Sequence, residues 1–366
     1  MKELAFPLAV MLLLVLIEML VLQRRQNAPW RDVVFNLNSG HVLMWHFRGL
    51  EILAFGALLT YFSVGWVGQW PIVYQWVFGF IAWDLCFYWM HRLHHTVPFL
   101  WNVHVVHHQG EHFNLSLGIR NSWYSSLSNF PFIAILAVLG LPLEIFVVVS
   151  SIHYAIQFYN HNGFVKNSGW LDKFLVTPKH HRVHHGMNKV YRDKNFGGTF
   201  LMWDKWFGSF QHELPDTPIL YGTHKPAPSN NPFLASNLPF LSYFKLKQPS
   251  LKKDHSIVLP DGFVAIAGFT LFALVIYTIY HDASFSNVQR AAFFILIFGG
   301  TLAIGSMSDG RRWGLLAWAS IAIISAILLL VQMHDALALV MTIILFLLGI
   351  DGLRRGIFLT RIHNSP

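Results

Sequence analysis

Thirteen of the 21 histidines lie between Asp84 and His185, and nine of these thirteen fall within three short patterns. The patterns are His91-Arg-Leu-His-His95, His104-Val-Val-His-His108 and His181-Arg-Val-His-His185. Residues three and four positions apart share one face of a helix, with about 5–6 Å between their Cβ atoms. Each pattern therefore directs two or three imidazoles towards a common point, and such clusters bind metals. The predicted ligands are His91, His95, His104, His107, His108, His181, His184 and His185.

A single histidine on an apolar face, or one i, i+4 pair, is usually an ordinary buried residue. Eight histidines in three helix-compatible sets are hard to explain in that way. The single cysteine, Cys86, leaves no set of thiolates for a structural zinc or iron–sulfur site. A closed tetrahedral zinc site would use four ligands and leave half of the histidines unexplained. We therefore expect a metal held by nitrogen and oxygen atoms.

The elements that must position these histidines are apolar helices. Hydrophobic residues make up 54% of the chain and charged residues only 12%, and several apolar runs approach or exceed the ~20 residues that cross a bilayer. The expected fold class is all-α, a polytopic membrane helical bundle with a histidine-rich cap. Spans are predicted at residues 4–22, 50–67 and 72–90, and again at 262–280, 291–307, 313–331 and 336–350.

Between these two sets of spans lies a pair of shorter apolar segments, at residues 127–139 and 143–159, interrupted by Gly140-Leu141-Pro142. The first is too short for a full crossing, so we expect a membrane hairpin over about 127–160 with both ends facing the histidines. The predicted organisation is N-terminal membrane helices in 1–90, a histidine-box catalytic region in 91–226, a linker rich in Pro, Asn and Ser in 227–258, and C-terminal membrane helices in 259–366.

The positive charges predict an orientation. Arg24, Arg25 and Arg31 follow the first apolar run instead of preceding it, which indicates a retained membrane helix and not a signal peptide. By the positive-inside rule the metal site faces the cytoplasm, with the N-terminus outside and the C-terminus inside. Residues 161–258 hold thirteen Lys and Arg against six Asp and Glu. This charge is diffuse, so we expect anionic lipid headgroups as its partner, and no nucleic acid.

Asp84 is the one carboxylate within the third predicted span, seven residues before His91 on the same helical face. A carboxylate inside a membrane is costly unless it has a partner. We expect it to orient a metal-bound imidazole through the ring's other N–H. The alternative is a hydrogen bond between helices that is unrelated to chemistry.

These motifs carry a family resemblance. Three parts of the sequence resemble the fatty acid hydroxylase/sterol desaturase superfamily of membrane di-iron enzymes. They are Asp84-Leu-Cys-Phe-Tyr-Trp-Met-His91 with the rest of the first histidine pattern, the second pattern from His104 to His108, and Thr177-Pro-Lys-His-His181, which opens the third. The resemblance covers roughly residues 80–226. Further similarity, to the ether-lipid branch of that superfamily, lies in the runs from His107 to Ser122, His185 to Asn188, Lys194 to Gly198, Trp203 to Gly208 and in Tyr221-Gly222.

The resemblance implies two Fe ions, molecular oxygen and an external electron donor, and the ether-lipid branch implies tetrahydrobiopterin. It also implies His161 as a further metal ligand, with His153 less certain. Glu111 and Arg120 are candidates for catalytic contacts to the pterin or the substrate, and a salt bridge that fixes their loop is the alternative. His94, His112 and His180 are not predicted to be ligands.

The predicted function is O2-dependent hydroxylation of a lipid C–H bond, most simply at the carbon next to an ether oxygen, as in cleavage of an alkylglycerol. Attack on an unactivated C–H bond needs an oxidising metal with an open position for oxygen in a dry cavity. A sterol or fatty acyl hydroxylase or desaturase is the alternative within the superfamily. A metal transporter would hold its ligands near the bilayer midplane, and a membrane haem protein would need axial histidines on facing spans.

Overall fold

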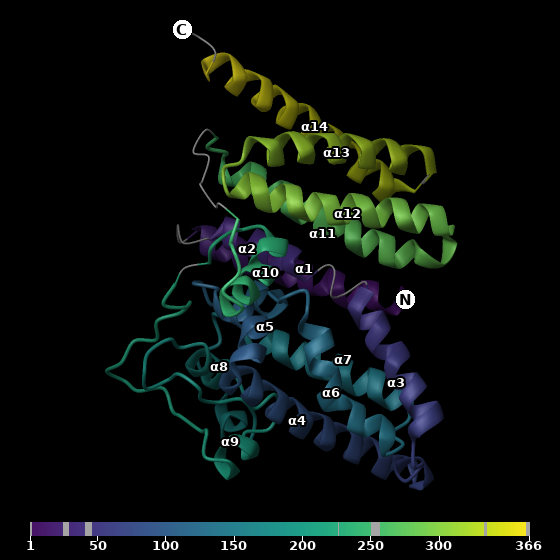
Figure 1. The fold of residues 1–366 in the computed structure, drawn as a ribbon, viewed down its shortest axis with the longest axis vertical. Helices are drawn as coiled ribbons and strands as arrows, with labels where there is room; N and C mark the ends of the chain where they lie inside the picture. Colours follow the sequence, from purple (N-terminus) through teal and green to yellow (C-terminus); the bar gives the residue numbers. More distant parts are fainter. Residues whose placement is uncertain are drawn as a thin grey trace. The chain divides into compact units, whose positions relative to one another are not determined.

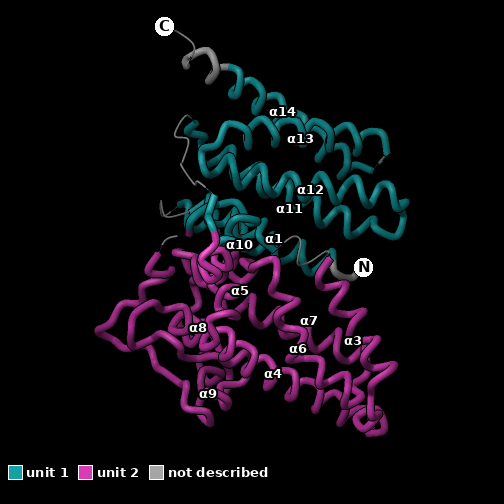
Figure 2. Tube along the Cα trace, viewed as in Figure 1, with its two compact units in different colours: residues 1–41, 228–238, 247–366 teal, residues 42–227, 239–246 magenta. Residues whose placement is uncertain are grey.

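A computed structural model describes residues 2–24, 29–40, 46–225, 227–249, 257–332 and 335–363. Within these ranges the chain forms α-helices joined by loops and short 3-10 turns, and Leu175 and Phe200 make an isolated antiparallel bridge (Figure 1). The predicted all-α fold is confirmed. The chain divides into two compact units, which are described in turn (Figure 2).

Unit 1 comprises residues 1–41, 228–238 and 247–366. Its helices are α1 (Lys2–Arg24), α2 (Trp30–Ser39), α11 (Asp261–His281), α12 (Asn287–Ser308), α13 (Arg312–Gln332) and α14 (Ala336–His363). Five helical segments here are long and apolar enough to cross a membrane: Ala5–Arg24, Asp261–Ser284, Asn287–Ser308, Arg312–Gln332 and Ala336–Ile357. The protein is therefore an integral membrane protein.

Unit 2 comprises residues 42–227 and 239–246 and contains every predicted site residue. Its helices are α3 (Arg48–Phe62), α4 (Ile72–Thr96), α5 (Pro98–His108), α6 (Ser125–Val138), α7 (Leu143–Asn160), α8 (Pro178–His184) and α9 (Met202–Trp206). Short 3-10 turns lie between them, among them η3 (Leu115–Ile119) and η4 (Gly169–Lys173). Helix α10 (Pro232–Tyr243) is divided between the two units.

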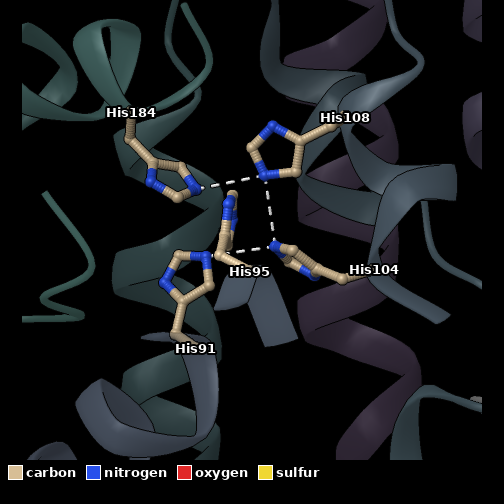
Figure 3. A group of neighbouring side chains, drawn as sticks. All are labelled: His91, His95, His104, His108 and His184. Atoms are coloured by element: carbon tan, nitrogen blue, oxygen red, sulfur yellow. Dashed lines mark hydrogen bonds between the residues drawn. The ribbon is translucent and has the colours of Figure 1, made fainter. Parts of the chain in front are cut away.

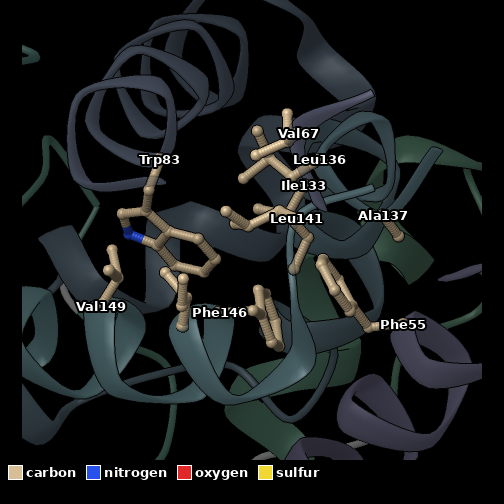
Figure 4. Packing of buried hydrophobic residues seen from close by; sticks show 10 residues of the cluster. Phe55, Val67, Trp83, Ile133, Leu136, Ala137, Leu141, Phe146 and Val149 are labelled. Carbon is tan, nitrogen blue, oxygen red and sulfur yellow. The ribbon is translucent and has the colours of Figure 1, made fainter. Parts of the chain in front are cut away.

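A buried apolar cluster joins α3, α4, α6 and α7 (Figure 4). The ring of Phe146 on α7 stacks on Phe55 of α3 at 3.8 Å between centroids and meets Trp83 of α4 edge-on at 5.4 Å. Burial of large aromatic side chains is the main stabilising term available to such a cluster. Because α4 and α7 are packed along their lengths, their C-terminal ends, which carry His91 and precede His161, are held in fixed positions.

The predicted hairpin is present as α6 and α7, joined through Gly140, Leu141 and Pro142. Gly140 has φ of +89°, and a Cβ atom there would lie 2.9 Å from the Cα atom of Gly65. Only glycine fits both requirements. The turn is held against the loop after α3, where the Val64 and Val67 amides donate to the carbonyls of Val138 and Leu139.

The structure differs from the expected boundaries in several places. Helix α1 packs against α11, whereas α3 and α4 pack against α6 and α7, so residues 1–90 are shared between the two units. The predicted span at 50–67 is helical only over Arg48–Phe62, and neither α3 nor α4 is among the five membrane candidates. Helix α4 continues past Met90 to Thr96, and the expected linker contains α10. Arg25, Lys252 and Lys253 lie outside the described residues.

Candidate metal centre

The three histidine patterns lie on helices whose ends are marked in the sequence. The first occupies the last turns of α4, and Pro98, at the first position of α5, starts the helix that carries the second. Proline suits this position because it lacks only an N–H that has no helical partner there. The third pattern lies on α8, which begins with Thr177 as N-cap and Pro178, and His180 completes a capping box with Thr177.

The nine histidines predicted as ligands converge in two groups, each with its ligand atoms within 4.8 Å of one another. The five-histidine group is His91, His95, His104, His108 and His184 (Figure 3). The four-histidine group is His107, His161, His181 and His185. His94 and His180, which were not predicted as ligands, belong to neither group, and nor does His153.

Distances within the groups fit a bound metal ion. His108 Nε2 lies 3.2 Å from both His104 Nε2 and His184 Nε2, and His91 Nε2 lies 3.1 Å from His104 Nε2. In the other group His161 Nε2 lies 3.0–3.2 Å from the Nε2 atoms of its three neighbours. With a metal–nitrogen distance of about 2.1 Å, two ligand nitrogens lie about 3.0 Å apart at a right angle and about 3.4 Å apart at the tetrahedral angle.

The positions of the ring protons show that the close contacts between Nε2 atoms are not ordinary hydrogen bonds. His107 Nδ1 donates to the Arg120 carbonyl at 2.9 Å, and His161 Nδ1 donates to the Gln157 carbonyl at 2.7 Å. A neutral imidazole has one N–H, so both Nε2 atoms carry lone pairs. Two lone pairs 3.2 Å apart repel each other unless a cation lies between them. The residues present therefore fit a metal.

Burial keeps the imidazoles neutral, which metal binding requires. It lowers the pKa of all nine, and repulsion from neighbouring rings lowers the pKa further for most of them; the pKa of His107 falls to about 4. At pH 7 each ring accordingly presents a lone pair.

Asp84 has partners different from the one expected. Its fully buried carboxylate accepts the amides of Thr199 and Phe200 at 2.7 and 3.0 Å, the Trp203 indole N–H at 2.8 Å, and a contact from His153 Nε2 at 3.1 Å. Asp84 was predicted to accept a hydrogen bond from a metal-binding imidazole. His91 instead donates its Nδ1 proton to the Phe196 carbonyl. A main-chain carbonyl thus holds this ring in place.

Arg120 and Glu111 occupy very different environments. Arg120 is buried, its Nε donates to the Val106 carbonyl at 2.6 Å, and its own carbonyl orients His107. Glu111 is exposed, and its Cγ would lie 3.1 Å from a Cβ atom at Gly222. Two residues later in the sequence, Phe113 stacks on both His161 and Tyr221, with centroid distances of 5.8 and 5.3 Å. Glu111 therefore lies on the segment that covers the four-histidine group.

Several residues with a role in the site were not predicted. Asn195 and Asp204 are fully buried, and both hold the backbone beside the metal ligands. Tyr88 is buried as well and bonds to Ser209 at 2.8 Å. The signal that could have found all three was present, because Tyr88, Asn195 and Asp204 lie in runs that resemble the superfamily.

Comparison with known proteins agrees with the motifs. Residues 76–209 match the family described as Fatty acid hydroxylase, so the resemblance noted above is confirmed. Alkylglycerol monooxygenase of Danio rerio is 38% identical over 157 residues, which is 43% of this chain and 34% of that protein. The Homo sapiens alkylglycerol monooxygenase is 31% identical over 222 residues, 59% of this chain and 48% of that protein.

A bacterial relative with a different substrate in its name is also similar. Ornithine lipid hydroxylase OlsE of Rhizobium tropici is 29% identical over 164 residues, 42% of this chain and 47% of that protein. The names of these relatives are all those of oxidoreductases. The chain covers between 34% and 48% of the length of these three proteins. No solved structure is significantly similar to the chain.

Proposed function

We propose that this protein is an O2-dependent lipid monooxygenase that uses two iron ions to hydroxylate a C–H bond. The observation that carries the proposal is the convergence of nine neutral imidazoles in two adjacent groups. Two iron ions bound there would supply the oxidising power and the open positions for oxygen. A single zinc site does not account for nine ligands.

The chain's own residues would hold and orient the reacting centre. The five-histidine group would hold one ion and the four-histidine group the other, with neutral Nε2 atoms as donors. The carbonyls of Phe196, Arg120 and Gln157 hold the Nδ1 protons and so prevent the rings from turning. Phe113 and Tyr221 cover the four-histidine group with apolar rings and would limit the access of water.

The proposed substrate is an ether lipid, because two alkylglycerol monooxygenases are 38% and 31% identical to parts of this chain and the loop from His107 to Ser122 resembles the ether-lipid branch. Insertion of one oxygen atom at the carbon next to the ether oxygen gives a hemiacetal, which breaks into an aldehyde and a glycerol derivative. The second oxygen atom leaves as water with two electrons from an external donor. The relative that hydroxylates ornithine lipid supports hydroxylation of an acyl lipid as the second candidate.

We propose tetrahydrobiopterin as the source of those electrons. We further propose that Glu111 contacts the pterin and that Arg120 supports its reaction indirectly. Glu111 is exposed beside Gly222 and could accept hydrogen bonds from a ring carrying N–H groups. Arg120 would act through the four-histidine group, since its carbonyl fixes His107. We propose a cytoplasmic location for this face, as the distribution of Lys and Arg along the chain predicts.

The test is a membrane assay under labelled oxygen with an alkylglycerol, an ornithine lipid and a sterol, each with and without tetrahydrobiopterin. Label in a fatty aldehyde only when alkylglycerol and pterin are both present is the expected result, and His184→Ala should abolish it. Hydroxylation of the acyl lipid or the sterol without pterin would refute the ether-lipid proposal. A fully active protein without iron would refute the metal assignment.

A further inference from the structure

One short segment provides the outer partners for three rings of the five-histidine group. Phe196 O accepts from His91 Nδ1 and Lys194 O accepts from His184 Nδ1, both at 2.9 Å, while Asp193 Oδ1 lies 3.4 Å from His95 Nδ1. The carbonyls that orient the four-histidine group belong instead to Arg120 and Gln157. The Nδ1 partners of the two groups therefore lie in different parts of the chain, and these parts meet where the Gln157 side chain donates to the Gly198 carbonyl at 2.8 Å.

The backbone of this segment, residues 193–199, adopts a conformation that needs support. Asp193 and Asn195 are left-handed, with φ of 59° and 54°, a region that costs residues other than glycine about 1–3 kcal/mol unless the surroundings impose it. Asn195 is held by bonds to the His180 and Gln211 carbonyls and from the Gln211 amide, at 2.8–3.1 Å.

Two fully buried carboxylates hold the segment on either side. Asp204 accepts the amides of Phe196 and Gly197 at 2.7 and 2.8 Å. Asp84 accepts the amides of Thr199 and Phe200. Hydrogen bonds from uncharged donors to a buried carboxylate are among the stronger ones, and leaving such a charge without them is costly. The carboxylates thus fix the peptide whose carbonyl orients His91.

Asp204 is in turn the end of a chain of hydrogen bonds that starts on the histidine helix. Arg92 donates to the Tyr88 hydroxyl at 2.8 Å, Tyr88 bonds to Ser209 Oγ at 2.8 Å, and Ser209 Oγ donates to Asp204 at 2.7 Å. Tyr88 and Arg92 lie on α4, one turn apart, next to His91. The position of the segment is therefore coupled to the helix that carries two of the five ligands.

We propose that Asp204 and Asp84 are positioning residues that serve the five-histidine group more directly than the four-histidine group. They act through the 193–199 segment, which sets the direction of His91, His95 and His184. The proposal rests on the two-metal function above. It adds that one metal site can be weakened while the other still binds its ion.

The test is metal stoichiometry in the full-length protein, measured as iron per chain after purification. The wild-type protein should hold about two ions. Asp204→Asn, which keeps the shape of the side chain, should hold about one. Tyr88→Phe, a milder change in the same hydrogen-bond chain, should weaken iron binding at one site by roughly tenfold or more. In the Asp204→Asn background, His185→Ala should remove the remaining ion, whereas His184→Ala should change little.

The matched control is Asp309→Asn in unit 1. Asp309 is also a buried carboxylate that accepts a main-chain amide, from Asn230 at 2.8 Å, and its partners among the described residues are Ser229 and Asn230. The Asp309→Asn variant should keep both ions. Two ions retained in Asp204→Asn, or both lost while the circular dichroism spectrum stays that of a folded protein, would overturn the proposal. A wild-type protein that binds no metal would instead refute the proposed function.

A second proposal comes from the surface of unit 2. Trp170, Phe174 and Trp206 are 69%, 62% and 69% exposed and lie together with Lys173 and Lys205, a set that we call the aromatic–lysine patch. The patch is one surface, because Lys205 Nζ donates to the Lys173 carbonyl and the Leu201 amide donates to the Phe174 carbonyl. Large aromatic side chains exposed as a group mark an interaction site.

Contacts with α4 show which part of that helix lies beside the aromatic–lysine patch. Phe200 packs on Phe80 at 5.8 Å between centroids, and Phe207 packs on Trp89 at 4.9 Å, so α9 lies beside residues 80–89. The preceding turns of α4 expose apolar side chains. These are Ile72, Val73 and Val77. From residue 81 to 89 α4 rises about 12 Å, comparable with the headgroup region that borders the ~30 Å hydrocarbon core.

We infer that the aromatic–lysine patch lies in the headgroup layer of the membrane and is an interfacial anchor of unit 2. Trp and Lys are the residues typical of that layer, because tryptophan places an apolar ring and a polar N–H at the boundary and lysine pairs with lipid phosphate. The exposed apolar turns of α4 then enter the hydrocarbon next to it.

Single-cysteine variants of the full chain in a Cys86→Ser background test this placement. Trp170→Cys and Trp206→Cys, labelled with a fluorophore in phosphatidylcholine–phosphatidylglycerol vesicles, should be quenched several-fold more by brominated lipid than the control Leu220→Cys, which is 57% exposed in the same unit. Quenching no greater than that of the control would overturn the proposal. Protection from water-soluble quenchers without quenching by lipid would also overturn it, because it would indicate a protein partner.

Discussion

At the scale of single residues, the site depends on which nitrogen of each ring carries the proton. His94 illustrates the distinction, because its sequence position is as suggestive as that of its neighbours. Its Nδ1 donates to the Met90 carbonyl and its Nε2 bonds to Ser128 at 2.9 Å, so neither nitrogen is free for a metal. His184, by contrast, uses only Nδ1 for a carbonyl and directs Nε2 into the five-histidine group.

The two residues should therefore respond differently to alanine. His184→Ala is expected to remove about half of the bound iron and to lower turnover by at least about a hundredfold, as the loss of a metal ligand does. His94→Ala should keep the iron and lose stability of order 1 kcal/mol, the value of a buried hydrogen bond. Iron content and turnover of the two purified variants check this, and equal iron loss in both would contradict the assignment.

The lowered pKa values predict how the metal-free protein responds to acid. An unfolded histidine has a pKa of about 6.5, whereas His107 in the folded protein has a pKa of about 4. The unfolded chain therefore binds more protons between these values, and stability present above pH 6.5 is lost as the pH falls towards 4. At pH 5 this amounts to about 2 kcal/mol for His107 alone. Thermal melts of the metal-free protein at pH 7 and pH 5 measure it, and an unchanged Tm would contradict it.

Sequence reasoning predicted the histidines that converge in the two groups more completely than the residues that support them. The three patterns predicted eight ligands because helical spacing is a local property, and the resemblance added His161. The partners of those ligands depend on contacts between distant residues, such as His91 with Phe196, which are 105 positions apart. No periodicity carries that information. For the same reason Asp84 was correctly recognised as a buried carboxylate in need of partners, but its partners were misassigned.

At the scale of elements, the short helix α8 and its C-cap residue His185 carry three of the predicted ligands. A helix of seven residues has little intrinsic stability, so its N-terminal cap matters. Thr177 supplies the cap, its hydroxyl donates to Asp172 at 2.7 Å, and its amide is paired with His180. The same element therefore shows why His180 is present without being a ligand: it closes the capping box.

Removing the cap should weaken the metal sites without touching a ligand. Thr177→Ala is expected to cost about 1 kcal/mol of folding stability and to lower iron affinity at both groups, because α8 contributes to both. Thr177→Ser keeps the hydroxyl and is the matched control. Iron titration and denaturant unfolding of the two variants measure the effect. Identical behaviour of the alanine and serine variants would show that the cap does not support the site.

At the scale of the whole molecule, the membrane arrangement of unit 2 is the feature that the sequence described least well. Helix α3 has fifteen residues, about 22 Å by helical rise, which is short of the ~30 Å hydrocarbon core. Together with α4 it ends in an exposed loop that contains Val64 and Trp66, 66% and 54% exposed. A loop rich in exposed apolar side chains fits the far interface of a crossed bilayer or the buried tip of a hairpin that returns.

Cysteine labelling separates these two arrangements and tests the predicted orientation. In a Cys86→Ser background, Asn167→Cys lies on an exposed loop of the histidine cap and should react with a membrane-impermeant maleimide only after cells are permeabilised. If α3 and α4 cross the bilayer, Val64→Cys should react in intact cells. A returning hairpin would leave Val64→Cys unreactive in both conditions and the metal site still inside. Reaction of Asn167→Cys in intact cells would place the site outside and contradict the proposed cytoplasmic location.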